Sequence, residues 1–138
     1  MIVADTNLVV YSVITGDRTA AAERVRQRDN DWTAPLLWAS EFRNVLATYV
    51  RADRLTPAQA HAAWVIGRAL VRDVPVEAAA VLDTAFARSL SDYDAEFVAL
   101  AERLGVPLVT GDRRVLEACP EFAVSLDAFT GEIEGGEG

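Results

Sequence analysis

The sequence contains no lysine, and all 13 of its basic residues are arginine. This absence excludes a P-loop lysine, a Schiff-base lysine and a lysine that assists phosphoryl transfer from an aspartate. Cys119 is the single cysteine and His61 the single histidine. These two side chains are too few for a structural zinc site, and a lone histidine makes a Ser-His-Asp triad a poor candidate. Chemistry in this protein must therefore come from carboxylates, hydroxyls and arginines.

Long apolar runs and export signals are also missing from the sequence. No run approaches the roughly 18 apolar residues that a membrane helix requires, and residues 1–5 show neither a basic start nor a signal-peptide stretch. A single cysteine excludes an intramolecular disulfide and fits a reducing compartment. We therefore expect a cytoplasmic protein that does not associate with membranes.

The length of 138 residues, 51% of them hydrophobic, suits one domain with one core. We expect this domain to span residues 1–130, and the acidic, glycine-rich tail at 131–138 to be disordered. The net charge of −8 argues against a nucleic-acid partner, because phosphate binding depends on basic side chains. A metal-dependent nuclease weakens this objection, since bound cations neutralise clustered carboxylates and contact phosphate themselves.

Short apolar segments alternate along the chain with longer segments of helical periodicity. The predicted strands are 2–4, 32–34, 74–76, 106–110 and 123–126. The predicted helices are 7–14, 17–28, 36–51, 56–72, 77–90, 91–104 and 113–118. Asp17 is a candidate cap for the second helix, and Thr56 to Gln59 form a capping-box start with proline at the first helical position. The alternation predicts an α/β fold, a three-layer α/β/α sandwich around a central parallel sheet.

Two aspartates follow predicted strands directly. Asp5 comes after the strand 2–4 and Asp112 lies just past the strand 106–110. Ligands of open parallel sheets bind outside the carboxyl ends of the strands, so these two carboxylates meet if their strands are neighbours. The alternative for each is a helix N-cap, a position that aspartate favours.

Glu41 and Asp94 stand on apolar helix faces. Glu41 lies three residues after Trp38 and four before Val45, within a stripe of helical spacing. An ionised carboxylate there needs a partner, because its unpaired desolvation costs several kcal/mol. The partner is a metal ion, or else an arginine, unless the helix is rotated so that Glu41 lies at the edge of the stripe. Asp94 begins a similar stripe, although Ser91 to Asp94 also resembles a capped first helical turn.

Four stretches carry these acids: Val3-Ala4-Asp5-Thr6-Asn7, Ser40-Glu41-Phe42-Arg43-Asn44-Val45-Leu46, Tyr93-Asp94-Ala95-Glu96-Phe97-Val98-Ala99-Leu100-Ala101 and Val109-Thr110-Gly111-Asp112-Arg113-Arg114. In this order and at these spacings, the chain resembles the PIN-domain ribonuclease family, in particular the VapC-type toxins of bacterial toxin–antitoxin pairs. The resemblance implies a PIN fold and a site for Mg²⁺ or Mn²⁺. It also implies endoribonuclease activity on RNA, a cognate antitoxin that restrains this activity, and a homodimer.

Carried over by position, Asp5, Glu41, Asp94 and Asp112 match the acidic quartet of the family and would bind the metal. Three polar residues match positions that flank the acids and would hold carboxylates and waters in place. These residues are Thr6, Asn7 and Thr110. Some relatives carry a further acid close after the fourth, whereas here only Asp92 or Glu117 could serve.

Arginines are the candidate contacts to substrate phosphate, because their guanidinium groups can bind phosphate through two donors. Arg113 and Arg114 directly follow Asp112, and Arg43 lies near Glu41. The alternative for each is a solvated or ion-paired side chain. The three tryptophans are candidates for stacking on bases, although helical spacing favours core or dimer packing for Trp38 and Trp64.

Three other classes of protein share some of these features. A phosphatase with an aspartyl nucleophile would need a second aspartate where Asn7 stands, and usually a lysine. A receiver-type signalling domain has a similar acidic pocket but also requires a lysine. A non-catalytic PIN-like module that binds a partner protein remains open, because the helices predicted at 17–28 and 56–72 carry enough apolar residues for an interface.

Overall fold

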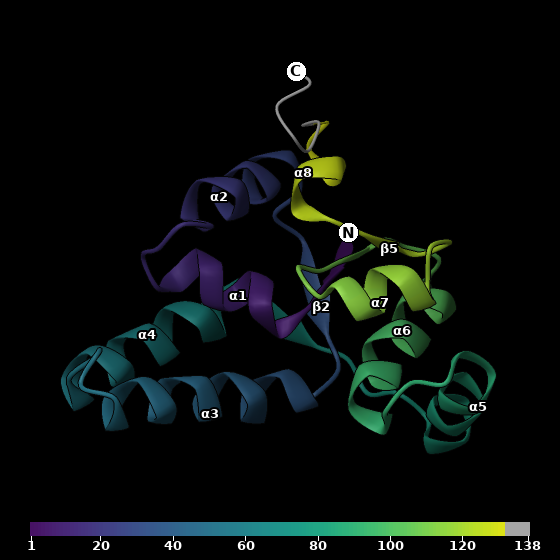
Figure 1. The fold of residues 1–138 in the computed structure, drawn as a ribbon, viewed down its shortest axis with the longest axis horizontal. Helices are drawn as coiled ribbons and strands as arrows, with labels where there is room; N and C mark the ends of the chain where they lie inside the picture. Colours follow the sequence, from purple (N-terminus) through teal and green to yellow (C-terminus); the bar gives the residue numbers. More distant parts are fainter. Residues whose placement is uncertain (132–138) are drawn as a thin grey trace.

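The computed structural model describes residues 1–131. Five short parallel strands form one sheet, in the order β3-β2-β1-β4-β5. Their bounds are β1 Ile2–Ala4, β2 Trp32–Ala34, β3 Val71–Asp73, β4 Leu108–Val109 and β5 Ala123–Val124. Figure 1 shows helices on both sides of these strands. The α/β class and the central parallel sheet are therefore confirmed, whereas most of the predicted disordered tail, 132–138, lies outside the described residues.

Eight helices occur within residues 1–131. They are α1 Thr6–Val13, α2 Thr19–Arg28, α3 Leu37–Arg51, α4 Pro57–Leu70, α5 Ala78–Arg88, α6 Asp92–Leu104, α7 Arg113–Ala118 and α8 Leu126–Phe129. The predicted capping box starts α4, since Thr56 and Gln59 exchange side-chain to backbone hydrogen bonds. Gly105 ends α6 with a φ of 66°, a conformation in which glycine has no steric penalty.

Three local predictions were wrong. Asp17 does not cap α2, because the helix starts two residues later with Arg18 at the N-cap and no side-chain cap. The strand expected at 74–76 lies at Val71–Asp73 and takes up the last two residues of the segment predicted as helix, because Val71 is buried and pairs with Trp32 of β2. The last strand ends at Val124, and the unpredicted helix α8 follows, capped by the Ser125 side chain.

The pairing of β1 with both β2 and β4 positions the ends of two strands for function. Val3 lies opposite Leu108, and Ala4 lies opposite Val109. Asp5 and Thr110, one residue further along each strand, therefore leave the sheet side by side. This arrangement brings the first and last acidic motifs together from opposite ends of the chain.

An aromatic cluster fixes helix α3 against α4. The Trp38 ring stacks on Phe42 and on Trp64, with centroids 5.9 Å apart in each pair. A Cβ at Gly67 would lie 2.5 Å from Phe42 Cε2, so glycine is what permits α4 to approach this closely. Trp38 is fully buried and Trp32 is 2% exposed, which excludes both from stacking on bases. In residues 1–131, none of the helices is long and apolar enough to cross a membrane.

Candidate metal site

Asp5 lies half-buried at the carboxyl end of β1 and is the N-cap of α1. One carboxylate oxygen accepts a hydrogen bond from the Thr6 amide at 2.8 Å, and the other accepts from Thr110 Oγ1 at 2.7 Å. Burial raises the pKa of Asp5 to about 6, and the neighbouring charges of Glu41 and Asp94 act in the same direction. Asp5 is thus a desolvated carboxylate held rigidly by two donors.

Glu41 projects from α3 toward Asp5. The Thr6 hydroxyl donates to Glu41 Oε1 at 2.6 Å, so Thr6 contacts one acid through its amide and the other through its side chain. Burial raises the pKa of Glu41, and the charge of Asp94 adds to this effect. Glu41 lies at the edge of the stripe whose buried members are Trp38, Phe42 and Leu46. No ion pair joins Glu41 to an arginine in the part of the chain that the structure describes.

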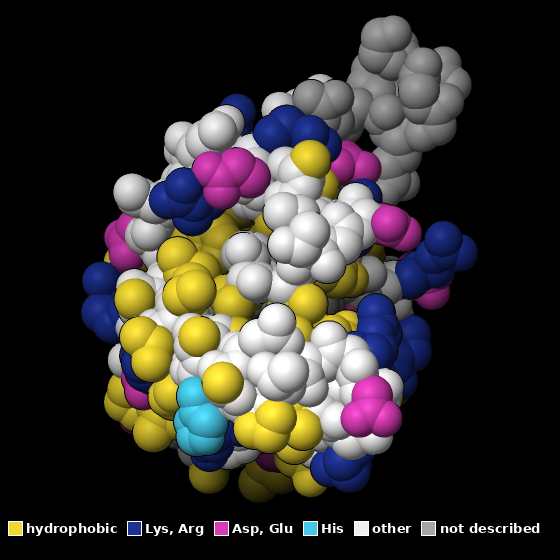
Figure 2. All heavy atoms as spheres, turned by 90° about the vertical axis from the view of Figure 1, so that its left-hand side faces the viewer, with side chains coloured by type: hydrophobic (Ala, Val, Ile, Leu, Met, Phe, Trp, Pro, Cys, Tyr) yellow, Lys and Arg dark blue, Asp and Glu magenta, His cyan; other side chains and the backbone are white. Residues whose placement is uncertain are grey.

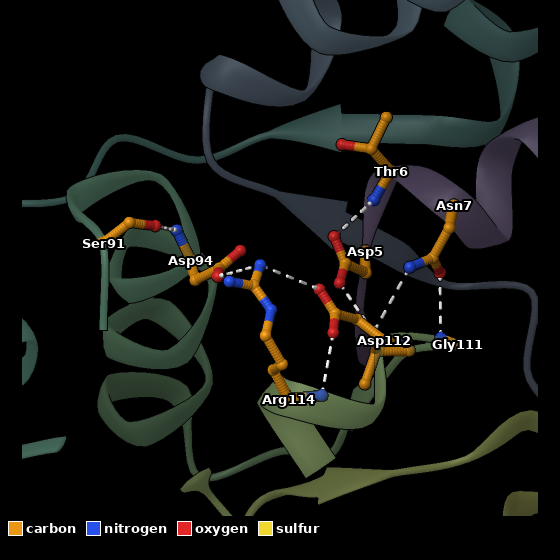
Figure 3. A network of polar contacts seen from close by, with 9 residues as sticks. Asp5, Thr6, Asn7, Ser91, Asp94, Gly111, Asp112 and Arg114 are labelled. Carbon is orange, nitrogen blue, oxygen red and sulfur yellow. Dashed lines mark hydrogen bonds and ion pairs between the residues drawn. The ribbon is translucent and has the colours of Figure 1, made fainter. Parts of the chain in front are cut away.

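Asp94 and Asp112 complete the group from α6 and α7. Ser91, and not Asp94, caps α6, since Ser91 Oγ accepts from the Asp94 amide at 3.1 Å. Burial raises the pKa of Asp94, and the charge of Asp112 adds to the shift. Asp112 is the N-cap of α7, where its Oδ1 accepts from the Arg114 amide at 2.9 Å. The capping alternative is therefore correct for Asp112. Its other oxygen, Oδ2, forms an ion pair with Arg114, and Arg114 also forms an ion pair with Asp94 (Figure 3).

Polar side chains tie the ends of β1 and β4 together. The fully buried Thr110 hydroxyl donates to Asp5 and accepts from the Asp112 amide at 2.9 Å. The Asn7 amide group donates to Thr110 Oγ1 at 3.4 Å and accepts from the Gly111 amide at 3.0 Å. These contacts hold the carboxylates in place, and Figure 3 shows the one between Asn7 and Gly111.

The four acids line one pocket of about 510 Å³ between α1, α3 and the ends of the strands. The structure therefore brings together Asp5, Glu41, Asp94 and Asp112. Thr6 and Asn7 line the same pocket. The residues that complete the lining are Val10, Tyr11, Asn44, Val45, Thr48 and Tyr49.

The residues of this pocket fit a divalent metal ion. Within residues 1–131, no three carboxylate, histidine or cysteine side chains are close enough to hold an ion directly. Mg²⁺, however, keeps several waters and needs only one or two carboxylates in direct contact. All the donors are hard oxygens, and Asp5 and Glu41 are desolvated without a basic partner among the described residues. A cation would relieve both their desolvation and their mutual repulsion.

The three candidate arginines occupy different positions. The guanidinium of Arg114 lies between Asp94 and Asp112, and Arg113 is exposed at the start of α7. Arg43 does not line the pocket. Its guanidinium lies 5.2 Å from the centroid of the Trp64 ring, on the face of α3 that packs against α4.

Glu96 is an acid near the site that the sequence did not single out. Burial raises its pKa to about 7, together with a hydrogen bond to Asp92 and the charges of Asp92 and Glu41. The charge of Glu41 acts on Glu96, so Glu96 lies near the pocket, although it does not line it. Asp92 is one helical turn before Glu96 and meets it, whereas Glu117 is exposed on α7. The spacing of four between Asp92 and Glu96, directly before the buried Phe97, was the available signal.

This combination of fold and site defines a class: α/β proteins with a carboxylate pocket at the C-terminal edge of a parallel sheet. The sequence model of the PIN domain matches residues 2–119, and the chain belongs to the PIN-domain family. No curated protein matches the chain.

Two solved structures share the fold. The crystal structure of PAE2754 from Pyrobaculum aerophilum is 21% identical with a TM-score of 0.78, covering 94% of this chain and 92% of that one. VapC20 from Mycobacterium tuberculosis, a toxin that cleaves the sarcin-ricin loop, is 21% identical with a TM-score of 0.65, covering 86% of this chain and 95% of that one.

Proposed function

We propose that this protein is a Mg²⁺- or Mn²⁺-dependent endoribonuclease and the toxin component of a type II toxin–antitoxin system. The convergence of Asp5, Glu41, Asp94 and Asp112 on one pocket carries the proposal, because two of these acids are desolvated without a basic partner in the described chain. Membership of the PIN-domain family and the likeness in fold to the toxin VapC20 support RNA as the substrate.

The residues of the pocket have separable roles in phosphodiester hydrolysis. When bound, a divalent ion neutralises the phosphate and lowers the pKa of a coordinated water. Asp5, fixed by Thr6 and Thr110, would hold the ion directly or through water, together with Asp94 and Asp112. Glu41 is oriented by the Thr6 hydroxyl and would bind the ion or position the attacking water. With a pKa of about 7, Glu96 can take up or release a proton beside Glu41 near neutral pH.

Substrate contact would fall to arginines at the start of α7. Arg113 is exposed and Arg114 already lies against the acids, so both can reach a phosphate that enters the pocket. Arg43 packs over Trp64 on the α4 side of α3 and is a weaker candidate for RNA binding than the sequence suggested.

An exposed apolar surface supports a protein partner, which we propose to be a cognate antitoxin. On α4, Val65 is 66% and Ile66 is 53% exposed. Ile66 also lines a groove of about 370 Å³ with Val13, Ile14 and Leu55, among others. Figure 2 shows hydrophobic side chains gathered on this face of helices α1 to α4. Burying such a surface is a common driving force of protein association.

A second apolar surface on α5 is our candidate for a homodimer contact. Phe86 is 75% exposed and Leu82, one turn earlier, is 48% exposed. The two side chains share one face of the helix. The single cysteine fits a reducing compartment, and we propose that the toxin acts in the cytoplasm.

RNA cleavage in Mg²⁺ by the wild type and by Asp5→Asn tests the proposed function. Asparagine keeps the size of the side chain and its N-cap role but removes the charge. We expect the wild type to cleave end-labelled RNA in Mg²⁺ and not in EDTA, and Asp5→Asn to lose at least 100-fold in rate, by analogy with other groups that stabilise charge in a transition state. The exposed Asp83→Asn on α5 is the matched control. Undiminished cleavage by Asp5→Asn would overturn the role of Asp5 in the site, and a wild type that does not cleave RNA in Mg²⁺ would favour a non-catalytic, partner-binding role.

A further inference from the structure

Arg114 provides an internal positive charge at the carboxylate pocket. Its Nη2 atom lies 3.4 Å from Asp94 Oδ2 and 3.7 Å from Asp112 Oδ2. Figure 3 shows the guanidinium group between the two carboxylates, which come from different helices. Arg114 is the only arginine in the described chain with an ion pair to a member of the acidic quartet.

Arg114 contacts one oxygen of each of two carboxylates that would hold a metal ion. Mg²⁺ binds carboxylate oxygens at 2.0–2.1 Å in near-octahedral geometry. Asp94 and Asp112 would hold the ion through carboxylate oxygens, and the guanidinium, which is also a cation, lies against one oxygen of each. A divalent ion and Arg114 would therefore compete for these two carboxylates.

The position of Arg114 allows it to leave. Its side chain is 79% exposed, whereas those of Asp94 and Asp112 are 23% and 29% exposed. Ion pairs of an exposed arginine are weak and are screened by salt. The local fold does not depend on the guanidinium, since Asp112 caps α7 through the Arg114 backbone amide.

We propose that Arg114 competes with the divalent metal ion for Asp94 and Asp112, and so sets the metal affinity of the pocket. The inference rests on the proposed function, because it assumes that the pocket binds such an ion. In the metal-free protein the guanidinium of Arg114 partly compensates the negative charges of the two acids. Displaced by the metal, its guanidinium is free at the rim of the pocket, where an RNA phosphate would enter.

Mn²⁺ binding by the purified full-length protein tests this competition without measuring catalysis. We would titrate Mn²⁺ into the wild type, Arg114→Gln and Arg113→Gln, and follow free Mn²⁺ by electron paramagnetic resonance. Both variants lose one positive charge from adjacent positions of α7, but only Arg114 contacts the acids. Thermal unfolding in EDTA shows that each variant is folded, and the Mn²⁺-induced rise in melting temperature gives a second measure of binding.

We expect Arg114→Gln to bind Mn²⁺ roughly 3- to 30-fold more tightly than Arg113→Gln. In Arg114→Gln the metal ion no longer has to displace two partly exposed ion pairs, each of which contributes little on its own. Equal affinity of the two variants would overturn the competition while leaving the proposed metal site intact. Weaker binding by Arg114→Gln would also overturn it, and would show that the arginine supports the site. If no variant binds Mn²⁺, both the competition and the proposed function fail.

Discussion

Replacing Asp5 by asparagine should stabilise the metal-free protein at pH 8. A carboxylate whose pKa is raised by desolvation to about 6 binds its proton more tightly in the native state than in the unfolded chain. Its ionisation therefore lowers the free energy of unfolding as the pH rises from 3.8, the ordinary pKa, to about 6, the pKa in the folded protein. Above roughly pH 6 to 7 this loss of stability is complete. Asparagine does not ionise, yet it retains an oxygen that can accept from Thr6 and cap α1.

The size of the effect follows from the difference between the two pKa values. The difference of about two units, at 1.36 kcal/mol each, amounts to about 3 kcal/mol at full ionisation. About half of this loss of stability falls between pH 5 and pH 8. In this range the wild type and the variant can be compared without acid denaturation. The asparagine amide must also donate to Thr110 in place of accepting from it, so we expect a net gain of about 1–3 kcal/mol at pH 8.

Urea denaturation of the wild type and Asp5→Asn in EDTA measures this gain as a function of pH. The stability of the variant relative to the wild type should rise from pH 5 to about pH 7 and then level off. The exposed Asp83→Asn should show no such trend. A difference that is independent of pH, or a variant that is less stable at pH 8 than at pH 5 relative to the wild type, would refute the reasoning that burial dominates the pKa of Asp5.

Two further substitutions test the packing and the polar network. Gly67→Ala should lower the free energy of unfolding in urea by about 1–3 kcal/mol, because its Cβ would overlap the Phe42 ring. A change below 0.5 kcal/mol, roughly the range of surface substitutions, would contradict the close approach of α3 and α4. Thr110→Val should lower the free energy of unfolding by about 1–3 kcal/mol and raise the pKa of Asp5 further, since it removes a hydrogen-bond donor that favours the ionised carboxylate. NMR titration of the Asp5 carboxyl group should show this shift, and an unchanged pKa would contradict the role of the Thr110 hydroxyl.

The sequence predicted those parts of the fold and site that depend on local signals. Thr56 and Gln59 start α4 as expected, because a capping box depends only on four consecutive residues of the sequence. Asp5 and Asp112 meet because they follow strands, and position after a strand is readable from an apolar run. The metal role of these acids stays a prediction, although the shared pocket supports it.

Features that depend on tertiary contacts were not predictable in the same way. Val71 and Arg72 were predicted as the end of a helix, and the pairing of Val71 with Trp32 makes them part of strand β3. Arg43 is close to Glu41 in sequence, but helical rotation directs it to Trp64 and away from the pocket. Glu96 shows its role only through the approach of Glu41 from another helix.

The central claim is that four converging carboxylates form a divalent metal site, and Mn²⁺ binding by Glu41→Gln tests it most directly. Glutamine preserves the length of the side chain and can still accept from Thr6, so the fold should persist. Isothermal titration of the wild type with Mn²⁺ should show saturable binding, and Glu41→Gln should weaken it by about tenfold or more. The exposed Glu117→Gln should bind like the wild type. Equal Mn²⁺ affinity of the wild type and Glu41→Gln, or no saturable binding by the wild type, would contradict the account.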